Sequence, residues 1–218
     1  MAKLKTAALI VLLICSFDLL NAQQFYKQTD ASQHWVDSVF NSLTPQQRIA
    51  QLMVVRESGT SSGKTVFYND KVDQLIHDYN IGSICLFQGG PVAQANLINH
   101  FQQIAQTPLM VCIDGETGLG MRMTDSVLKF PDQLTLGAVQ DASIIYEVGK
   151  AIGEQCKREG IQVNYAPVVD INNNPNNPVI NFRSFGEDKY KVALFGTQMM
   201  RGMRKQYNGL RQTFSGAW

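Results

Sequence analysis

Short apolar runs alternate with amphipathic helical segments along most of this chain, and that alternation restricts the fold more than any other feature. Each apolar run is short and is flanked by Gly or Pro, which is typical of a buried strand in a parallel sheet. The predicted strands are residues 52–55, 82–87, 109–113 and 163–166, and the predicted helices are residues 33–43, a short helix that starts at Thr44, and residues 70–80, 92–106, 143–159 and 189–205. Strands separated by helices of this length form right-handed βαβ units, so the sequence predicts an α/β fold with a parallel sheet.

Two parallel architectures compete for this pattern. The residues suited to chemistry follow the predicted strands directly, which is where a (β/α)8 barrel holds its active site. The alternative is a doubly wound open sheet, which usually carries a Gly-rich phosphate loop after its first strand. Gly59 and Gly63 follow the first strand here, but residues 57–69 read as a long Gly/Ser loop that lacks the GxGxxG spacing. We therefore expect an incomplete (β/α)8 TIM barrel, roughly its first half.

Charge and cysteine usage exclude several classes of function. The net charge is +1, which gives no electrostatic case for nucleic acid or an anionic membrane as a partner. Cys85, Cys112 and Cys156 have no short spacing, which argues against a disulfide framework and against a zinc site. Because Cys85 and Cys112 lie in apolar runs, we expect them to be buried as small hydrophobic residues. We expect no cofactor and no metal.

The N-terminal segment has the pattern of a secretory signal. Lys3 and Lys5 precede an uninterrupted apolar run, residues 7–13, and small or apolar residues surround a cleavage point after Ala22. The apolar run is shorter than the roughly 20 residues that a spanning helix needs. We therefore expect residues 1–22 to be cleaved, no membrane anchor to remain, and the product to be periplasmic or secreted.

Two strand ends carry the residues that suit a polar ligand. Asp114 ends the third predicted strand, and a Gly-rich turn leads from it to Arg122. The fourth predicted strand is followed by Asp170, by a long loop rich in Asn and Pro, and by Arg183. A carboxylate accepts two sugar hydroxyls and a guanidinium brackets adjacent oxygens, so these side chains could form the wall of a sugar site. Plainer explanations stay open, namely a local ion pair that closes a turn and a surface loop with an ordinary salt bridge.

Five spaced segments, all in the matching order, resemble glycoside hydrolase family 3. The segment PLMVCIDGETGLGMR, from Pro108 to Arg122, is similar to the family's "IDxEGGxVxR"; residues 130–138 are similar to "FP…LGA", residues 163–186 to "NFAPVxDxNxNPxNPVIxxRSFG", residues 44–54 to "eKIGQLxMV", and residues 81–87 to "IGGVILF". The similarity covers nearly all of the sequence after the signal segment. The nearest subgroup is the β-N-acetylhexosaminidases, the NagZ-like enzymes, and the run from Gly118 to Arg122 resembles secreted Bacteroidetes members.

The resemblance implies a retaining glycosidase whose N-terminal domain is a (β/α)8 barrel. Its substrates would be oligosaccharides or peptidoglycan fragments that end in β-linked N-acetylglucosamine. Matched position by position, Asp114, Arg122 and Arg183 would contact the hydroxyls of the terminal sugar. Asp170 matches an acid near that subsite, where it would help to hold Arg183 or touch the substrate. Metal ions and cofactors have no role in this implied chemistry.

The resemblance also implies that this sequence contains none of the catalytic residues. The family's acid/base His lies on a loop at "KHFPGHG" and its nucleophilic Asp comes much later, so both are expected beyond Trp218. Residues 212–218 can be spelled CAA ACA TTT TCC GGG GCA TGG, and the next frame of that spelling encodes Lys-His-Phe-Pro-Gly-His. We therefore expect residues 23–210 to be the N-terminal part of the barrel, residues 211–218 to be a frameshifted tail, and this chain alone to be inactive.

Two other functions remain in competition with a hexosaminidase. One is a β-glucosidase of the same family, and the other is a non-catalytic module that binds sugar with Asp114, Arg122 and Arg183. Hydrolysis of a nitrophenyl N-acetylglucosaminide against a nitrophenyl glucoside separates the two enzymes. A downstream frame that encodes KHFPGHG and more barrel favours an enzyme over a binding module.

Overall fold

The computed structural model describes residues 29–123, 125–205 and 211–212, and these fall into two units, residues 1–40 and residues 41–218. The signal segment expected at residues 1–22 lies outside the described residues. The first unit contains most of helix α2 (Asp30–Ser42), which covers the helix predicted at residues 33–43 except for its last residue. No residue of α2 is buried, although its apolar side chains gather at helical spacing.

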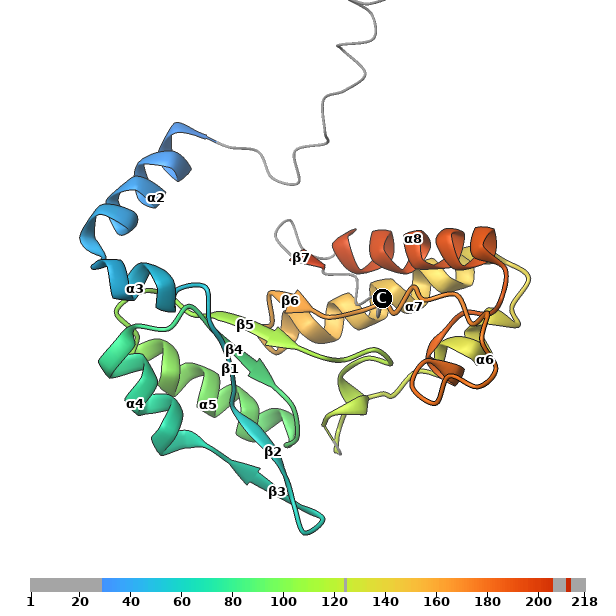
Figure 1. The fold of residues 1–218 in the computed structure, drawn as a ribbon, viewed down its shortest axis with the longest axis horizontal. Coiled ribbons are helices and arrows are strands. Elements are labelled where there is room, and N and C mark those ends of the chain that lie inside the picture. The colour runs from blue at the N-terminus through green and yellow to red at the C-terminus, as the bar shows by residue number, and fades with distance from the viewer. Residues whose placement is uncertain (1–28, 124, 206–210, 213–218) are drawn as a thin grey trace, which may run out of the picture. The chain divides into compact units, whose positions relative to one another are not determined.

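The second unit contains the remaining helices and strands (Figure 1). In chain order they are α3 (Pro45–Ala50), β1 (Val54–Arg56), β2 (Ser58–Ser61), β3 (Lys64–Phe67), α4 (Asn69–Tyr79), β4 (Ser83–Leu86), α5 (Pro91–Ile104), β5 (Met110–Ile113), η1 (Leu119–Met121), α6 (Gln133–Gly137), α7 (Ala142–Arg158), β6 (Val163–Asn164), η2 (Asn181–Arg183), α8 (Lys189–Lys205) and β7 (Arg211–Gln212). All four predicted strands and all predicted helices are present, with small differences at their ends. In the described part of the chain, no helix has the length and apolar character that crossing a bilayer requires.

The main sheet has five strands in the order β1-β4-β5-β6-β7, and every neighbouring pair is parallel. Each new strand of this sheet is therefore added at the same edge as the chain advances. A doubly wound sheet instead reverses direction at a switch point. The observed order is that of successive strands in a (β/α)8 barrel, as expected from the sequence.

The two faces of this sheet have different coverings. Ile84, Leu86, Val111 and Ile113 point to one face, where they pack in a single core with side chains from α4, α5, α7 and α8. The alternate strand residues, Cys85, Cys112 and Val163, form a separate small cluster on the other face, with Phe87 and Tyr165 at its margin. Helices on one face only are the arrangement of a barrel, whose helices form an outer ring. Cys85 and Cys112 are buried and unpaired, which confirms the expectation for these two thiols.

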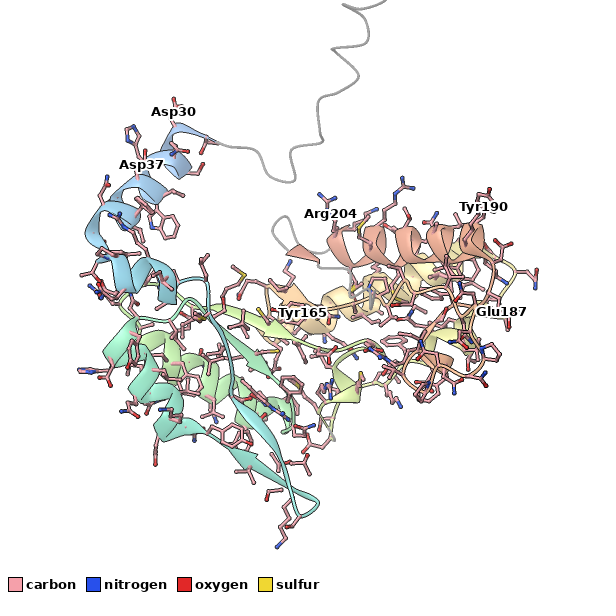
Figure 2. The ribbon with its side chains drawn as sticks, in the orientation of Figure 1. Asp30, Asp37, Tyr165, Glu187, Tyr190 and Arg204 are labelled. Carbon is pink, nitrogen blue, oxygen red and sulfur yellow. The ribbon has the colours of Figure 1, made fainter. Side chains whose placement is uncertain are left out.

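Helices α7 and α8 pack closely because glycines remove the side chains between them. A Cβ on Gly149 would lie 2.2 Å from the carbonyl oxygen of Met199, and one turn later a Cβ on Gly153 would lie 2.6 Å from that of Met203. The contacts advance in the same direction along both helices, so the helices are parallel, as successive helices of βαβ units must be. The outer side of α8 faces solvent, where Tyr190 is exposed (Figure 2).

Replacing Gly149 by alanine is expected to destabilise the fold by about 2 kcal/mol or more, measured by denaturant unfolding. In an open helix the same change would stabilise by up to about 1 kcal/mol, because alanine is the better helix former. The opposite sign is expected here because the new methyl group overlaps the backbone of the neighbouring helix. Lys150→Ala, which removes only an exposed pair with Glu147 on the same helix, serves as the control and should change stability little.

The expectation of a loop at residues 57–69 is wrong, because most of this segment is a β-hairpin. Strands β2 and β3 are antiparallel, with Ser58 opposite Phe67 and Ser61 opposite Lys64. Ser62 and Gly63 connect them with φ angles of 50° and 75°. Two consecutive positive φ angles build the tight turn whose twist matches a hairpin. The Gly and Ser content that suggested a loop therefore belongs to the turn and to two short polar strands.

Candidate functional site

The carboxyl ends of the parallel strands gather polar side chains at one edge of the sheet. Glu57 follows β1, Asp114 follows β5, and Tyr165 follows β6. Because neighbouring strands run in the same direction, residues that follow them lie at the same edge. Two arginine–carboxylate pairs occupy this edge, and both include residues selected from the sequence.

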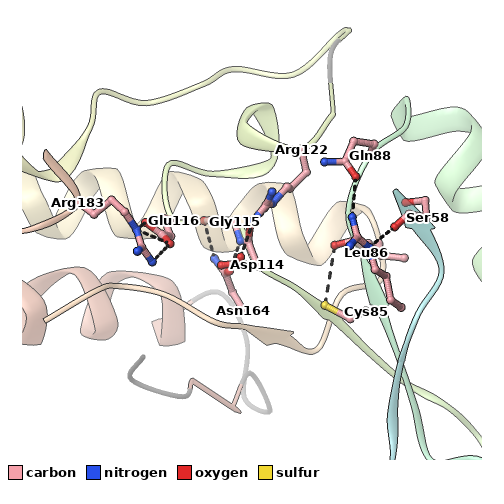
Figure 3. Close-up of polar contacts among 11 residues, drawn as sticks. Ser58, Cys85, Leu86, Gln88, Asp114, Gly115, Glu116, Arg122, Asn164 and Arg183 are labelled. Atoms are coloured by element: carbon pink, nitrogen blue, oxygen red, sulfur yellow. Dashed lines mark hydrogen bonds and ion pairs between the residues drawn. The ribbon is translucent and has the colours of Figure 1, made fainter. Parts of the chain in front are cut away.

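The first pair joins Asp114 to Arg122 across a short turn (Figure 3). The Arg122 guanidinium forms an ion pair with the Asp114 carboxylate, and its Nε donates to the Asp114 carbonyl oxygen at 2.6 Å. The guanidinium also lies over the ring of Phe87, 4.8 Å from the ring centroid. The Asp114 side chain keeps 31% of its exposure, so one side of the carboxylate remains open to solvent. The local ion pair considered from the sequence is real, and it leaves acceptor capacity for a ligand.

The second pair joins Arg183 to Glu116, a contact that the sequence interpretation did not include. Arg183 Nε donates to Glu116 Oε2 at 2.9 Å and its Nη2 donates to Oε1 at 2.6 Å (Figure 3). Glu116 is nearly buried, with 5% of its side chain exposed, and this charged hydrogen bonding raises the pKa of the Arg183 guanidinium. Arg183 Nη1 also donates to the carbonyl of Val179 at 3.3 Å, so the side chain is held on two sides.

Asp170 acts on Arg183 through its charge, and its backbone forms a hydrogen bond with the neighbouring loop. Its carbonyl oxygen accepts the Ser184 hydroxyl at 2.6 Å, one residue from Arg183. The charges of Asp114 and Asp170 both add to that of Glu116 in raising the pKa of Arg183. The structure therefore brings Asp114, Arg122 and Arg183 together at one edge, with Asp170 beside them.

Asn164 positions the backbone between the two acids. It is fully buried at the end of β6 and bonds both polar atoms of Gly115, accepting from the amide at 3.0 Å and donating to the carbonyl at 3.1 Å. Gly115 separates Asp114 from Glu116, so this contact fixes the peptide from which both carboxylates project (Figure 3). Sequence reasoning missed Asn164 and the role of Glu116. A buried amide inside a strand was the available signal for Asn164, since such a group needs partners.

Asn164→Ala is expected to destabilise the fold by about 2–4 kcal/mol, because the Gly115 amide and carbonyl would lose their partners in a buried place. Unfolding by urea measures the loss. Gln140→Ala, which removes an exposed side chain with one bond of 3.3 Å, is the control and should stay within about 0.5 kcal/mol of the parent. Equal effects of the two changes would contradict the positioning role of Asn164.

The Asn/Pro loop between Asp170 and Arg183 is ordered by its own side chains. Asn174 Oδ1 accepts from the amide of Asn176, and Asn177 Oδ1 accepts from that of Val179. These short-range bonds are the reason that Asn favours ordered turns. The amide of Asn172 closes the loop by donating to the Gly186 carbonyl at 3.0 Å.

A second segment supports this loop from outside. A Cβ on Gly137 would lie 2.0 Å from the Phe185 carbonyl oxygen, so the helix α6 backbone touches the loop directly. The side chain of Gln133, at the start of α6, forms two hydrogen bonds with the Val168 backbone. It donates to the carbonyl at 2.5 Å and accepts from the amide at 3.1 Å. The segments at residues 130–138 and 163–186, selected as separate motifs, are therefore in direct contact.

The two buried thiols of the sheet are not suited to acid–base chemistry. Burial raises the pKa of Cys85 to about 12, and it raises that of Cys112 as well, so both remain neutral thiols. Among the described residues, the histidines lie on helices, as expected: His34 on α2, His77 on α4 and His100 on α5. The two arginine–carboxylate pairs can instead present fixed donors and acceptors to adjacent hydroxyl groups.

Comparison with known proteins identifies a family. The sequence model described as "Glycosyl hydrolase family 3 N terminal domain" matches residues 44–214. "Beta-hexosaminidase A" of Pseudoalteromonas piscicida is 36% identical over 143 residues, which is 60% of this chain and 24% of that protein. "Beta-hexosaminidase LpqI" of Mycobacterium tuberculosis is 28% identical over 166 residues, which is 74% of this chain and 40% of that protein.

A solved structure agrees in fold and in sequence. The glycoside hydrolase family 3 beta-N-acetylglucosaminidase from Paenibacillus sp. str. FPU-7 aligns with a TM-score of 0.69 and 35% identity, covering 80% of this chain and 33% of that one. The chain thus spans less than half the length of each of these relatives.

Proposed function

This chain belongs to glycosyl hydrolase family 3, and we propose on that premise that it is the N-terminal, sugar-binding part of a retaining β-N-acetylhexosaminidase. The proposed substrate is an oligosaccharide or peptidoglycan fragment that ends in β-linked N-acetylglucosamine. A relative at 36% identity carries a hexosaminidase name and a solved structure at 35% identity carries an N-acetylglucosaminidase name, which favours this activity over a glucosidase.

The observation that carries the proposal is the pair of arginine–carboxylate contacts at the carboxyl edge of a barrel-type sheet. Asp114 keeps an open side on its carboxylate, and Arg122 is held beside it by an ion pair and by the Phe87 ring. Arg183 is fixed by Glu116 and has donors left over, since a guanidinium carries five N–H groups. Together they supply acceptors and donors for the hydroxyls of one terminal sugar ring.

In this proposal the chain's own residues bind and orient the sugar and do not act on the glycosidic bond. A retaining glycosidase needs an acid/base and a nucleophile. The carboxylates of Asp114 and Glu116 are each engaged with an arginine, which suits binding and not proton transfer. Contacts that are equally strong in the ground and transition states do not accelerate the reaction. We therefore propose that both catalytic groups come from sequence other than residues 23–210.

The proposal also covers the two ends of the sequence, residues 1–22 and residues 211–218. The charged and apolar pattern of residues 1–22 supports cleavage of a signal segment and a periplasmic or secreted product. Residues 211–218 are proposed to be read in the wrong frame. The frame-restored enzyme, meaning a version that continues through Lys-His-Phe-Pro-Gly-His after residue 211 and onward in that frame, is the protein to assay for turnover.

Hydrolysis of nitrophenyl N-acetylglucosaminide and nitrophenyl glucoside by the frame-restored enzyme tests this function. We expect the N-acetylglucosaminide to be turned over with the higher kcat/KM, and the chain as given to hydrolyse neither substrate. A preference for the glucoside would replace the hexosaminidase with a glucosidase. Turnover by the chain as given, abolished by Glu116→Gln, would show that the acid pairs are catalytic and would contradict the proposal.

A further inference from the structure

A cluster of buried oxygen atoms without partners lies at the end of strand β1. Glu57, Ser58 and Gln94 are each fully buried. Both carboxylate oxygens of Glu57, the Ser58 hydroxyl and Oε1 of Gln94 have no hydrogen-bond partner at normal geometry among the described residues. Leaving one such buried group without a hydrogen bond costs about 1–3 kcal/mol. Several unpartnered oxygen atoms in one cluster therefore indicate that a further hydrogen-bond donor is needed there.

The neighbours of Glu57 show what that donor can be. The Ser58 and Gln94 side chains and the Phe87 backbone lie close enough to favour its charged form, and so does the positive charge of Arg56. Burial outweighs all of these and raises the pKa of Glu57 to about 7 from its ordinary value of 4.5. Cys85, which also lies near Glu57, is a neutral thiol, so it neither pairs with Glu57 nor repels it.

We propose that Glu57 holds a proton at mildly acidic pH and donates it to Oε1 of Gln94, so that protonation links the end of β1 to helix α5 by a hydrogen bond and ionisation breaks this bond. Gln94 is already oriented for this role, because its Nε2 donates to the Gln88 carbonyl at 2.9 Å and its Oε1 is left to accept. One proton on Glu57 thereby supplies the donor that the acceptor atoms of Glu57 and Gln94 lack.

The proposed hydrogen bond between Glu57 and Gln94 lies near the edge of the sheet that carries the arginine–carboxylate pairs. Arg56, next to Glu57, lies 4.3 Å over the ring of Phe87, and Arg122 lies over the same ring. Release of Glu57 would therefore act on the strand end that supports Arg122. The effect of the Glu57 proton on folding stability does not depend on which ligand binds at the carboxyl edge of the sheet.

The sign of the pH dependence follows from the two pKa values. The folded chain binds the proton more tightly than the unfolded chain between about pH 4.5 and pH 7. The stabilisation is complete below about pH 4.5 and is lost as the pH rises through 7. From about pH 5.5 to about pH 8, Glu57 should raise the unfolding equilibrium constant roughly 30-fold.

Urea unfolding of the full chain and of Glu57→Gln at these two pH values tests the proposal. Glutamine resembles the neutral acid and cannot ionise, so the variant should lose the roughly 30-fold rise and exceed the parent in stability at about pH 8. Glu147→Gln, which changes an exposed acid on α7, is the matched control and should keep the rise. An unchanged pH dependence in Glu57→Gln would overturn the proposal.

A direct titration covers the case in which the variant fails to fold. Carbon-13 NMR of the Glu57 side-chain carboxyl in the unmodified chain should show a pKa near 7, and a value below about 5 would contradict the proposal. Sodium, potassium or calcium chloride should not stabilise the parent more than Glu57→Gln. A larger gain for the parent would mean that a cation, and not a proton, fills the cluster.

Discussion

Replacing Asp114 by alanine is expected to lower kcat/KM for a nitrophenyl N-acetylglucosaminide about a hundredfold to ten-thousandfold in the frame-restored enzyme. Two charged hydrogen bonds from sugar hydroxyls to one carboxylate would contribute about 1.5–3 kcal/mol each. Stability should fall by only about 1 kcal/mol, because the Asp114–Arg122 pair is partly exposed. Arg122 also keeps two other contacts, the Asp114 carbonyl and the Phe87 ring.

Asp114→Asn is the matched control, because it keeps the size of the side chain and one acceptor oxygen while removing the charge. It should fall between the parent and Asp114→Ala in kcat/KM. Near-normal turnover by Asp114→Ala would contradict its assignment to the sugar site. A loss of activity that merely follows a loss of folded protein, seen by circular dichroism, would assign Asp114 to structure instead.

Replacing Glu116 by glutamine is expected to lower the free energy of unfolding by about 2–3 kcal/mol. Removing one partner of a buried ion pair leaves the other charge uncompensated, and this typically costs 3–5 kcal/mol when both partners are fully buried (about 2–3 is expected here). The lower figure applies because Arg183 keeps 30% of its exposure. Denaturant unfolding of the full chain measures the change.

Asp170→Asn is compared with this variant. Because Glu116 accepts hydrogen bonds from both Nε and Nη2 of Arg183, Asp170→Asn should cost clearly less than Glu116→Gln. The double change of Glu116→Gln with Arg183→Met should recover part of the loss, since no unpaired charge then remains. Equal losses from Asp170→Asn and Glu116→Gln would contradict the leading role of Glu116 in holding Arg183.

Local features of the fold followed directly from the sequence. The short helix predicted to start at Thr44 is present, and the structure contains a full capping box, in which the Thr44 side chain and the Gln47 side chain bond each other's backbone amides. Helix α8 has the predicted bounds, Lys189–Lys205, and β4 is buried along its whole length, as its apolar run indicated. These features depend on residues a few positions apart, so spacing alone reveals them.

Pairings between distant residues were the part that the sequence did not reveal. Arg183 and Glu116 are 67 positions apart, and only Asp170 was considered from the sequence as an acid beside Arg183. Whether a distant acid reaches Arg183 depends on where the loop returns, which is set by packing. The Asn164–Gly115 contact spans 49 positions and was missed for the same reason. The hairpin at residues 58–67 was missed because its strands are short and polar.

Titration of N-acetylglucosamine into the full chain and into Asp114→Ala, followed by ligand-observed NMR, tests the sugar site most directly. Binding depends only on residues that this chain contains, so the measurement does not require catalytic groups. We predict saturable binding by the parent and at least a tenfold weaker affinity for Asp114→Ala, as expected from the loss of one or two charged hydrogen bonds of about 1.5–3 kcal/mol. Equal binding by both proteins, or no binding by a parent chain that is folded, would contradict a sugar site built on Asp114, Arg122 and Arg183.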